Sequence, residues 1–222
     1  MRPVVVFDLD GTLLDTGPDL LRALNRLLVD EGVAAVAHTD VATLYGHGAR
    51  ALITEGFRRA ARPLDASRLP GMIERFVGFY AGAIAVETRP YPGLVLALDR
   101  LVARGAGLAV CTNKREALGQ AVLAGTGLSP LFSAVIGGDS LPEQKPHPRP
   151  LVEAIVRAGG VPEAAVMVGD SETDIATARA AGVPVIAVDF GYGGRPAAEL
   201  SADAVIAHYD ELDDAVARFL AL

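Results

Sequence analysis

The sequence predicts an α/β fold: a Rossmann-like, doubly wound parallel sheet interrupted by an inserted all-helical segment. An apolar, β-branched run at Pro3–Phe7 opens the chain, and no convincing strand pattern occurs between Gly17 and Pro90. After that point short apolar strands alternate with amphipathic helices. Such alternation is typical of right-handed crossovers and a parallel sheet with helices on both faces. The opening strand and the alternating part are therefore expected to share one sheet.

The opening strand ends in two carboxylates. Asp8 and Asp10 follow the apolar run directly, and Gly11 and Thr12 come next. A strand covered on both faces does not end in two carboxylates unless their charge is compensated. A divalent cation would compensate it, and oxygen ligands suit Mg²⁺. The alternative is an acidic turn, since Asp and Gly are common turn residues, and this stretch alone leaves both interpretations open.

The inserted segment is expected to consist of helices. Pro18 and Asp19 suit a first helical turn. Gly32 ends this helix, whose apolar face is formed by Leu20, Leu21, Leu24, Leu27 and Leu28. Two further helices are expected over residues 39–62 and 67–86.

The sequence after residue 90 predicts that strands and helices alternate. Strands are expected at residues 107–112, 134–137, 165–169, 185–188 and 204–207. Helices are expected at residues 94–104, 116–124, 148–158, 173–181 and 210–220. In such sheets the ligand site lies outside the carboxyl ends of the strands, and that is where this sequence places its polar residues.

Charge and cysteine content exclude several classes of function. The chain has 222 residues and a formal net charge of −7. Nucleic acids and acidic membranes attract basic surfaces, so the charge argues against binding to either. Cys111 is the only cysteine, which excludes an intrachain disulfide and fits a reducing, cytoplasmic location. No signal peptide is expected, because Asp8 and Asp10 interrupt the first apolar run. No apolar run approaches the roughly 20 residues needed to cross a bilayer.

Polar residues that could carry chemistry follow several of the expected strands. They are Asp8, Asp10, Thr112, Asn113, Lys145, Asp170 and Asp174. Each alone has an ordinary explanation, such as a helix cap or a solvated loop lysine. Together, in this order and at the same edge of one sheet, they indicate a site. The glycine-rich stretch Gly191–Gly194 lacks a Walker pattern and is expected to be a loop at the rim.

These residues resemble the four motifs of the haloacid dehalogenase superfamily phosphatases. Asp8–Thr12 match the first motif, DxDGT, and Thr112 matches the strand-ending Ser or Thr of the second. Lys145 matches the lysine of the third, and Gly169–Asp174 match the fourth, GDxxxD. Within the superfamily the chain most resembles phosphoglycolate phosphatases, above all in the stretch Gly137–Leu151.

The resemblance implies a domain organisation and an activity. Residues 1–16 and 89–222 would form a Rossmann-like catalytic core, and residues 17–88 a helical cap domain. The implied enzyme is a Mg²⁺-dependent phosphomonoesterase that hydrolyses 2-phosphoglycolate, so its partner would be a small phosphorylated metabolite. Neither nucleic acid nor membrane is an expected partner, and the protein would be a monomer or a homodimer.

The resemblance also implies a role for each carboxylate. Asp8 would attack phosphorus and form an aspartyl phosphate. Asp10 would protonate the leaving alkoxide and then take a proton from the hydrolytic water. Asp8, the backbone carbonyl of Asp10 and Asp170 would bind Mg²⁺. Asp174 would orient the waters of the metal or the side chain of Lys145.

Substrate contacts are expected from both domains. The phosphate would be held by Leu9 through its backbone N–H, and by Thr112, Asn113 and Lys145. From the cap, Arg50 in the loop Gly46–Arg50 could pair with a substrate carboxylate, although a solvated arginine in a helix-joining loop is an equally good interpretation. No catalytic role is expected for His47.

Other activities of the superfamily are partly excluded. A dehalogenase lacks the second aspartate, which Asp10 supplies here, and a phosphonatase uses a cap lysine, whereas residues 17–88 contain none. Another phosphatase, a pyrophosphatase or a phosphosugar mutase would have the same core motifs and stays open. A non-catalytic binding protein on this fold is a more distant alternative, because such a protein could dispense with Asp8 or Lys145.

Overall fold

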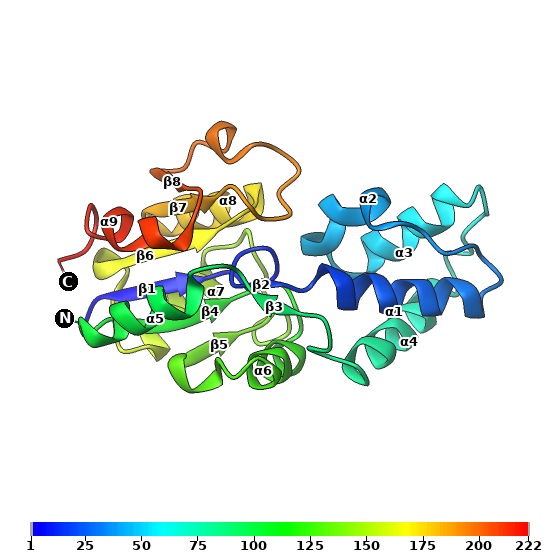
Figure 1. Ribbon diagram of the computed structural model, residues 1–222, viewed down its shortest axis with the longest axis horizontal. Helices are drawn as coiled ribbons and strands as arrows, with labels where there is room; N and C mark the ends of the chain where they lie inside the picture. The colour runs from blue at the N-terminus through cyan, green and yellow to red at the C-terminus, as the bar shows by residue number, and fades with distance from the viewer. Residues whose placement is uncertain (1, 222) are drawn as a thin grey trace.

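A six-stranded parallel sheet forms the centre of the larger part of the molecule (Figure 1). The computed structural model describes residues 2–221. The strands lie in the order β5-β4-β1-β6-β7-β8. Their bounds are β1 Val4–Phe7, β4 Gly107–Cys111, β5 Ala134–Ile136, β6 Ala165–Gly169, β7 Val185–Val188 and β8 Ala204–Ile206. Each was expected to within one residue at either end, and the predicted α/β class is confirmed.

Helices cover both faces of this sheet because successive side chains of each strand point to opposite faces. Val5 and Phe7 of β1 belong to one hydrophobic cluster, together with α5, α6 and α9. Val4 and Val6 belong to a second cluster, together with α7 and α8. These helices span α5 Leu94–Ala103, α6 Glu116–Gly125, α7 Arg149–Arg157, α8 Glu172–Ala181 and α9 Leu212–Val216. The sheet is thus buried on both sides, which explains its continuous apolar strands.

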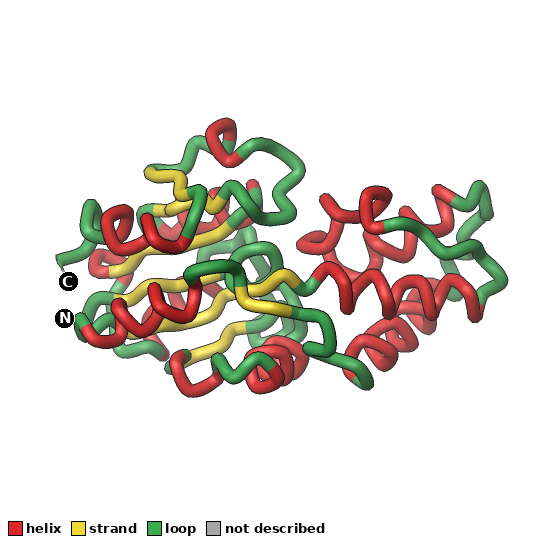
Figure 2. Tube along the Cα trace, in the orientation of Figure 1, coloured by secondary structure: helices red, strands yellow, loops and turns green. Residues whose placement is uncertain are grey.

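The inserted segment packs around a hydrophobic cluster of its own. Its described residues form helices and loops, which lie to one side of the sheet (Figure 2). The α-helices are α1 Gly17–Asp30, α2 His38–Val41, α3 Gly48–Arg59 and α4 Leu69–Ala81. Helix α1 contributes the leucines expected on its apolar face, of which Leu24, Leu27 and Leu28 are fully buried.

The prediction of one continuous helix over residues 39–62 is wrong. Helix α2 is followed by a 3₁₀ helix, Ala42–His47, and α3 begins only at Gly48. Gly48 has a φ of 82°, a left-handed conformation that an α-helix cannot pass through and that favours glycine. The closing helix is also shorter than expected, since a 3₁₀ turn at Tyr209–Glu211 precedes α9.

The two chain segments that join the helices to the sheet run side by side. Strands β2 (Leu14–Asp15) and β3 (Arg89–Pro90) form an antiparallel pair that the sequence did not indicate. Next to this pair, the buried carboxylate of Asp19 accepts hydrogen bonds from the backbone N–H groups of Glu87 and Thr88 and from the Thr88 hydroxyl. The outgoing and returning segments are therefore tied together at their start.

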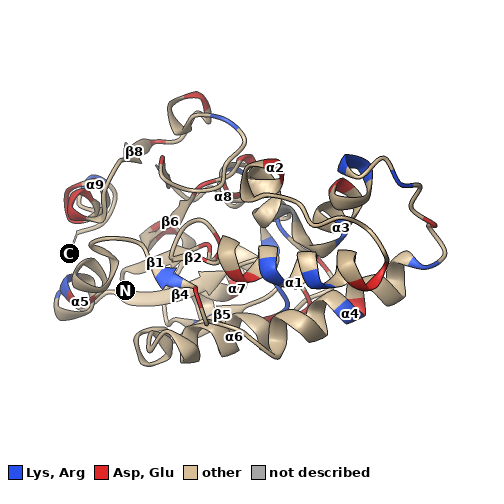
Figure 3. Cartoon of the chain, turned by 45° about the vertical axis from the view of Figure 1, so that its right-hand side comes forward, with Lys and Arg blue, Asp and Glu red and all other residues tan. Residues whose placement is uncertain are grey.

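The surface of the described chain carries charges of both signs. Acidic and basic positions are interspersed along the inserted helices (Figure 3), for example in the ion pair of Arg75 with Asp30. None of the helices within residues 2–221 has the length and apolar character to cross a membrane. Cys111 is buried in β4 as a free thiol, as expected.

Candidate active site

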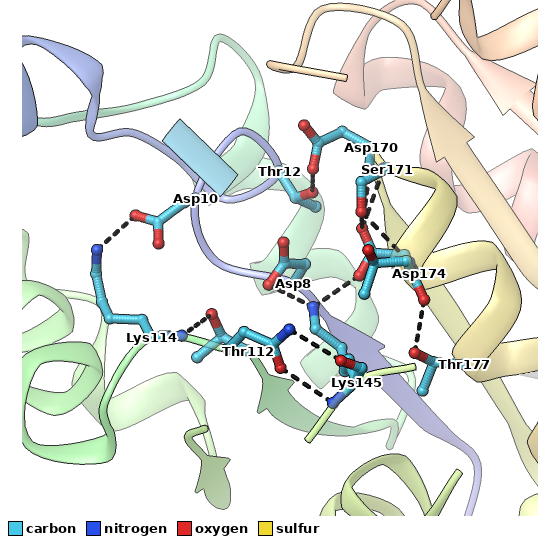
Figure 4. Close-up of polar contacts among 12 residues, drawn as sticks. Asp8, Asp10, Thr12, Thr112, Lys114, Lys145, Asp170, Ser171, Asp174 and Thr177 are labelled. Carbon is cyan, nitrogen blue, oxygen red and sulfur yellow. Dashed lines mark hydrogen bonds and ion pairs between the residues drawn. The ribbon is translucent and has the colours of Figure 1, made fainter. Parts of the chain in front are cut away.

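The carboxyl ends of three neighbouring strands bring the predicted residues together. Strand β1 lies between β4 and β6, so Asp8, Thr112 and Asp170, each of which follows one of these strands, meet at one edge of the sheet. Lys145 reaches the same place from the segment between β5 and α7. All four side chains are buried, and Figure 4 shows Thr112, Lys145 and Asp170 around Asp8.

Lys145 holds two carboxylates. Its Nζ lies 2.8 Å from Oδ1 of Asp8 and 2.7 Å from Oδ1 of Asp174. Burial alone would lower the pKa of Lys145, but the carboxylates of Asp174 and Asp8 raise it, so the ammonium group stays charged. Burial raises the pKa of Asp8, while Lys145 opposes this shift. Lys145 is thus a fixed positive charge beside Asp8.

Asp170 is held by polar groups from two loops. The Thr12 hydroxyl donates to its Oδ1 at 3.0 Å, and the backbone N–H of Tyr192 donates to its Oδ2 at 2.8 Å. Burial, and then the carboxylates of Asp174 and Asp8, raise the pKa of Asp170. No cationic side chain within the described residues pairs with it, so its charge is compensated less than that of Asp8.

These carboxylates fit a divalent metal. Asp8, Asp170 and Asp174 each offer an oxygen, and these oxygens lie within 4.8 Å of one another. A group of three buried carboxylates with a single lysine leaves negative charge that a hard cation would neutralise. Asp174 has its Oδ1 paired with Lys145 and accepts three hydrogen bonds at its Oδ2. Within residues 2–221, Asp170 accepts only one at each oxygen, so Asp8 and Asp170 are the better ligands. The described donor set therefore fits the metal dependence expected from the sequence.

The carboxylate of Asp10 points away from this group. Its Oδ1 accepts a hydrogen bond from the Thr16 hydroxyl at 2.5 Å and from Nζ of Lys114 at 2.8 Å. Figure 4 shows Asp10 and Lys114 on the opposite side of Asp8 from Asp174. That the backbone carbonyl of Asp10 binds the metal stays a prediction.

Asn113 and Leu9 support the site from the chain that surrounds it. The Asn113 side chain donates to the backbone carbonyl of Lys145 and accepts from its backbone N–H, so it positions the loop that carries the lysine. Leu9 is buried in the hydrophobic core. That either residue contacts the phosphate stays a prediction.

A cavity of about 690 Å³ connects these residues with the inserted helices. Its wall includes Asp8, Asp10 and Lys114 from the sheet part, and Arg50 and Tyr80 from α3 and α4. Arg50 is exposed and lies in the first turn of α3, rather than in a loop. The side chain of His47 lies outside the described residues, so the expectation that it has no role stays a prediction.

Tyr192 is a site residue that sequence reasoning missed. It belongs to the glycine-rich stretch expected at the rim, and its backbone binds Asp170. Its hydroxyl donates to Asp15 and accepts from the backbone N–H of Gly17, while its ring packs against Tyr45 at 5.0 Å between centroids. One residue therefore contacts the candidate metal ligand, the linker and an inserted helix. The flanking glycines were the signal, because a Cβ on Gly191 would lie 2.3 Å from Cβ of Asp170.

Comparisons with known proteins agree with this geometry. A family model described as haloacid dehalogenase-like hydrolase matches residues 5–188. A phosphoglycolate phosphatase of Mesorhizobium japonicum is 45% identical over 211 residues, which cover 95% of this chain and 93% of that protein. A phosphoglycolate phosphatase of Caulobacter vibrioides is 47% identical over 202 residues, which cover 91% of this chain and 85% of that protein.

A solved structure shows the same arrangement of both parts of the chain. The crystal structure described as a predicted phosphoglycolate phosphatase from Haemophilus somnus superimposes with a TM-score of 0.88 at 32% identity. The match covers 96% of this chain and 97% of that one. The fold and the site thus define a hydrolase with a carboxylate cluster at the strand ends. The chain belongs to the haloacid dehalogenase-like hydrolase family.

Proposed function

We propose that this hydrolase cleaves 2-phosphoglycolate to glycolate and phosphate through an aspartyl-phosphate intermediate on Asp8. The observation that carries the proposal is the position of Asp8, buried at the end of β1, with Lys145 at 2.8 Å and Asp170 in the same cluster. The substrate is proposed from the names of the relatives described above. It is a small phosphorylated metabolite, as the sequence led us to expect.

In the proposed reaction a carboxylate oxygen of Asp8 forms a bond to phosphorus as the bond to the ester oxygen breaks. Asp10 gives a proton to the departing alkoxide of glycolate. Asp10 then accepts a proton from a water that attacks phosphorus, which breaks the bond to Asp8 and releases phosphate. Asp10 suits this double role because it lines the same cavity as Asp8, and its carboxylate lies apart from Lys145.

The remaining polar groups would stabilise charge on the phosphoryl oxygens. Lys145 and the Thr112 hydroxyl would bind these oxygens, and Asp174 would keep Lys145 in place. Asp8, Asp170 and the backbone carbonyl of Asp10 would hold Mg²⁺, which supplies further positive charge at the phosphoryl group.

We propose that residues 17–88 act as a cap domain on a core of residues 1–16 and 89–222. Support comes from their separate hydrophobic cluster, the paired linkers and the cavity shared by both parts. A cap of this kind excludes water and selects the leaving group. Arg50 would meet the carboxylate end of the substrate from the cap side.

The test is phosphate release by the purified protein from a panel of phosphate compounds with Mg²⁺. The panel contains 2-phosphoglycolate, ethyl phosphate, sugar phosphates, nucleotides and pyrophosphate. We expect the highest kcat/KM for 2-phosphoglycolate and loss of turnover with excess EDTA, restored by added Mg²⁺. A clearly higher kcat/KM for another compound would overturn the substrate assignment, and undiminished turnover in EDTA would overturn the metal.

A further inference from the structure

Lys114 is a buried cation on the leaving-group side of the cavity. Its side chain is 6% exposed, and its Nζ lies 2.8 Å from Oδ1 of Asp10. The reaction proposed above gives this ammonium group no task. A lysine has three donors; one of them goes to Asp10, and the ammonium group also lies beside Tyr80.

Tyr80 of α4 supplies a second unused group at the same place. Its side chain is fully buried, 1% exposed, and the Lys114 ammonium group lies 4.6 Å from the centre of its ring. Its hydroxyl has no hydrogen-bond acceptor within residues 2–221, and the polar group that lies against it is the Lys114 ammonium. A buried hydroxyl without an acceptor is costly, so a ligand that accepts a hydrogen bond there would remove that cost.

The position of Asp10 fixes what such a ligand would be. A leaving-group oxygen that receives a proton from Asp10 lies within about one hydrogen-bond length of its carboxyl, about 2.8 Å. Lys114 lies at a similar distance on the same carboxyl. In a glycolate leaving group the carboxylate is separated from the ester oxygen by a single methylene. The substrate carboxylate would therefore come within reach of Lys114.

We propose that Lys114 and Tyr80 form a carboxylate-binding subsite that selects 2-phosphoglycolate over phosphate esters without a carboxylate. This inference rests on the proposed function and names the residues that recognise its leaving group. The Lys114 ammonium group binds the carboxylate as an ion pair, and the Tyr80 hydroxyl donates a hydrogen bond to it.

The other cations around the cavity are less suited to this task. Lys145 is taken up by Asp8 and Asp174. Arg115 forms an exposed ion pair with Glu74, and Arg195 forms one with Glu172. Arg50 is exposed, where a charge pair is weak and screened by salt. The buried position of Lys114 gives a charge pair more of its strength.

The subsite also joins the two parts of the molecule. Lys114 belongs to the segment that follows β4, and Tyr80 belongs to the last turn of α4 in the cap. A carboxylate bound to both would contact core and cap at once. Binding of the correct leaving group is thereby coupled to the position of the cap.

The experiment compares kcat/KM for 2-phosphoglycolate with kcat/KM for ethyl phosphate, both with Mg²⁺. In Lys114→Gln we expect the ratio of the two values to fall about 10- to 100-fold, as for loss of a hydrogen-bonded charge. Lys114→Arg is expected to recover part of the ratio. In Tyr80→Phe we expect a smaller fall, seen in KM for 2-phosphoglycolate. Arg115→Gln, which removes the neighbouring exposed cation, serves as the matched control and should keep the wild-type ratio.

A second measurement separates binding from turnover, since Lys114 also contacts Asp10. Glycolate is expected to inhibit ethyl phosphate hydrolysis competitively in the wild type and less strongly in Tyr80→Phe and Lys114→Gln. Wild-type preference for 2-phosphoglycolate with an unchanged ratio and unchanged glycolate inhibition in both variants would overturn the subsite alone. Lack of that preference in the wild type would overturn the proposed function itself. If Lys114→Gln has no measurable turnover, the kcat/KM ratio and the glycolate inhibition of Tyr80→Phe and Lys114→Arg test the subsite instead.

Discussion

The two ends of the cavity are built differently. At the phosphate end, Asp8 and Asp170 follow strands of one sheet, and Lys145 lies in the segment after β5. Lys145 pairs with Asp8 and Asp174, and the Thr12 hydroxyl donates to Asp170. At the proposed leaving-group end, Lys114 follows β4, whereas Tyr80 and Arg50 belong to the inserted helices α4 and α3. There the Tyr80 hydroxyl has no acceptor within the described residues, and Arg50 is exposed.

Because of this difference, the residues that carry the reaction and the residues that select the substrate are expected to lie at different ends of the cavity. A site held within a single sheet keeps its geometry whatever the cap does, because its groups move together. A site shared between core and cap changes when the two parts shift. Substitutions at the phosphate end are therefore expected to affect every substrate, and those at the leaving-group end to affect mainly the carboxylated one.

The largest effect is expected at the phosphate end. Asp8→Asn removes the nucleophilic carboxylate but keeps the shape of the side chain. We expect kcat to fall about 10³-fold or more for 2-phosphoglycolate and ethyl phosphate alike, since the first step of the reaction is lost. Phosphate release measures this, with a thermal melt as a check on folding. Substantial turnover by a folded Asp8→Asn protein would contradict the nucleophile assignment.

A second prediction concerns the linkers between the two ends. Asp19→Asn places an amide opposite the donors of Glu87 and Thr88, and we expect the free energy of unfolding to fall by about 1–3 kcal/mol at pH 7. Urea denaturation measures it. A loss of activity without a loss of stability would instead place Asp19 in the site.

The effect of Asp19 should depend on pH. Burial would raise its pKa, but hydrogen bonds from Thr88 and Glu87 hold the pKa of the Asp19 carboxyl below its usual value. Its stabilising contribution is therefore present above the pKa of the unfolded chain, about 3.9, and is lost as pH falls through the lower folded value. The stability difference between wild type and Asp19→Asn should be largest near pH 7 and shrink below about pH 4. A difference that grows on acidification would contradict this sign.

The smallest effect is expected at the exposed edge of the leaving-group end. Arg50→Ala should raise KM for 2-phosphoglycolate about 2- to 5-fold and leave ethyl phosphate unchanged, as for an exposed charge pair. Equal losses on both esters would reject a role of Arg50 in carboxylate recognition. A larger shift in the ratio than Lys114→Gln produces would move the main carboxylate contact from the core to the cap.

Much of the phosphate end could be predicted from the sequence because its signals are local. A buried strand that runs into Asp8, or into Asp170, marks a strand end within a few residues, and parallel order brings such ends together. The six strands followed from the same local patterns. Metal ligation by a carbonyl of Asp10 came only from resemblance to a family, since no pattern of side chains encodes it.

The leaving-group end could not be predicted in the same way. The contacts of Lys114 with Asp10 and Tyr80 join residues far apart in the chain. The contact with Tyr80 exists only because α4 packs against the segment that follows β4. From the sequence, Tyr80 is expected on the apolar face of a helix, and Tyr192 in a glycine-rich loop, so neither pattern predicts a contact with the site. The break of the helix at Gly48 was also missed, because its left-handed φ is one of several conformations open to glycine.

The β2–β3 pair brings the two ends of the helical insertion close together. Because Asp15 lies opposite Arg89 in the ladder, the chain leaves and re-enters the sheet at neighbouring points, so a short turn could bridge them. The insert can therefore change in length or sequence over generations without altering the order of the strands. Related proteins could keep the same phosphate-binding residues and exchange the helical insertion that contacts the leaving group. A protein engineer could likewise graft a foreign helical insertion at the same two points.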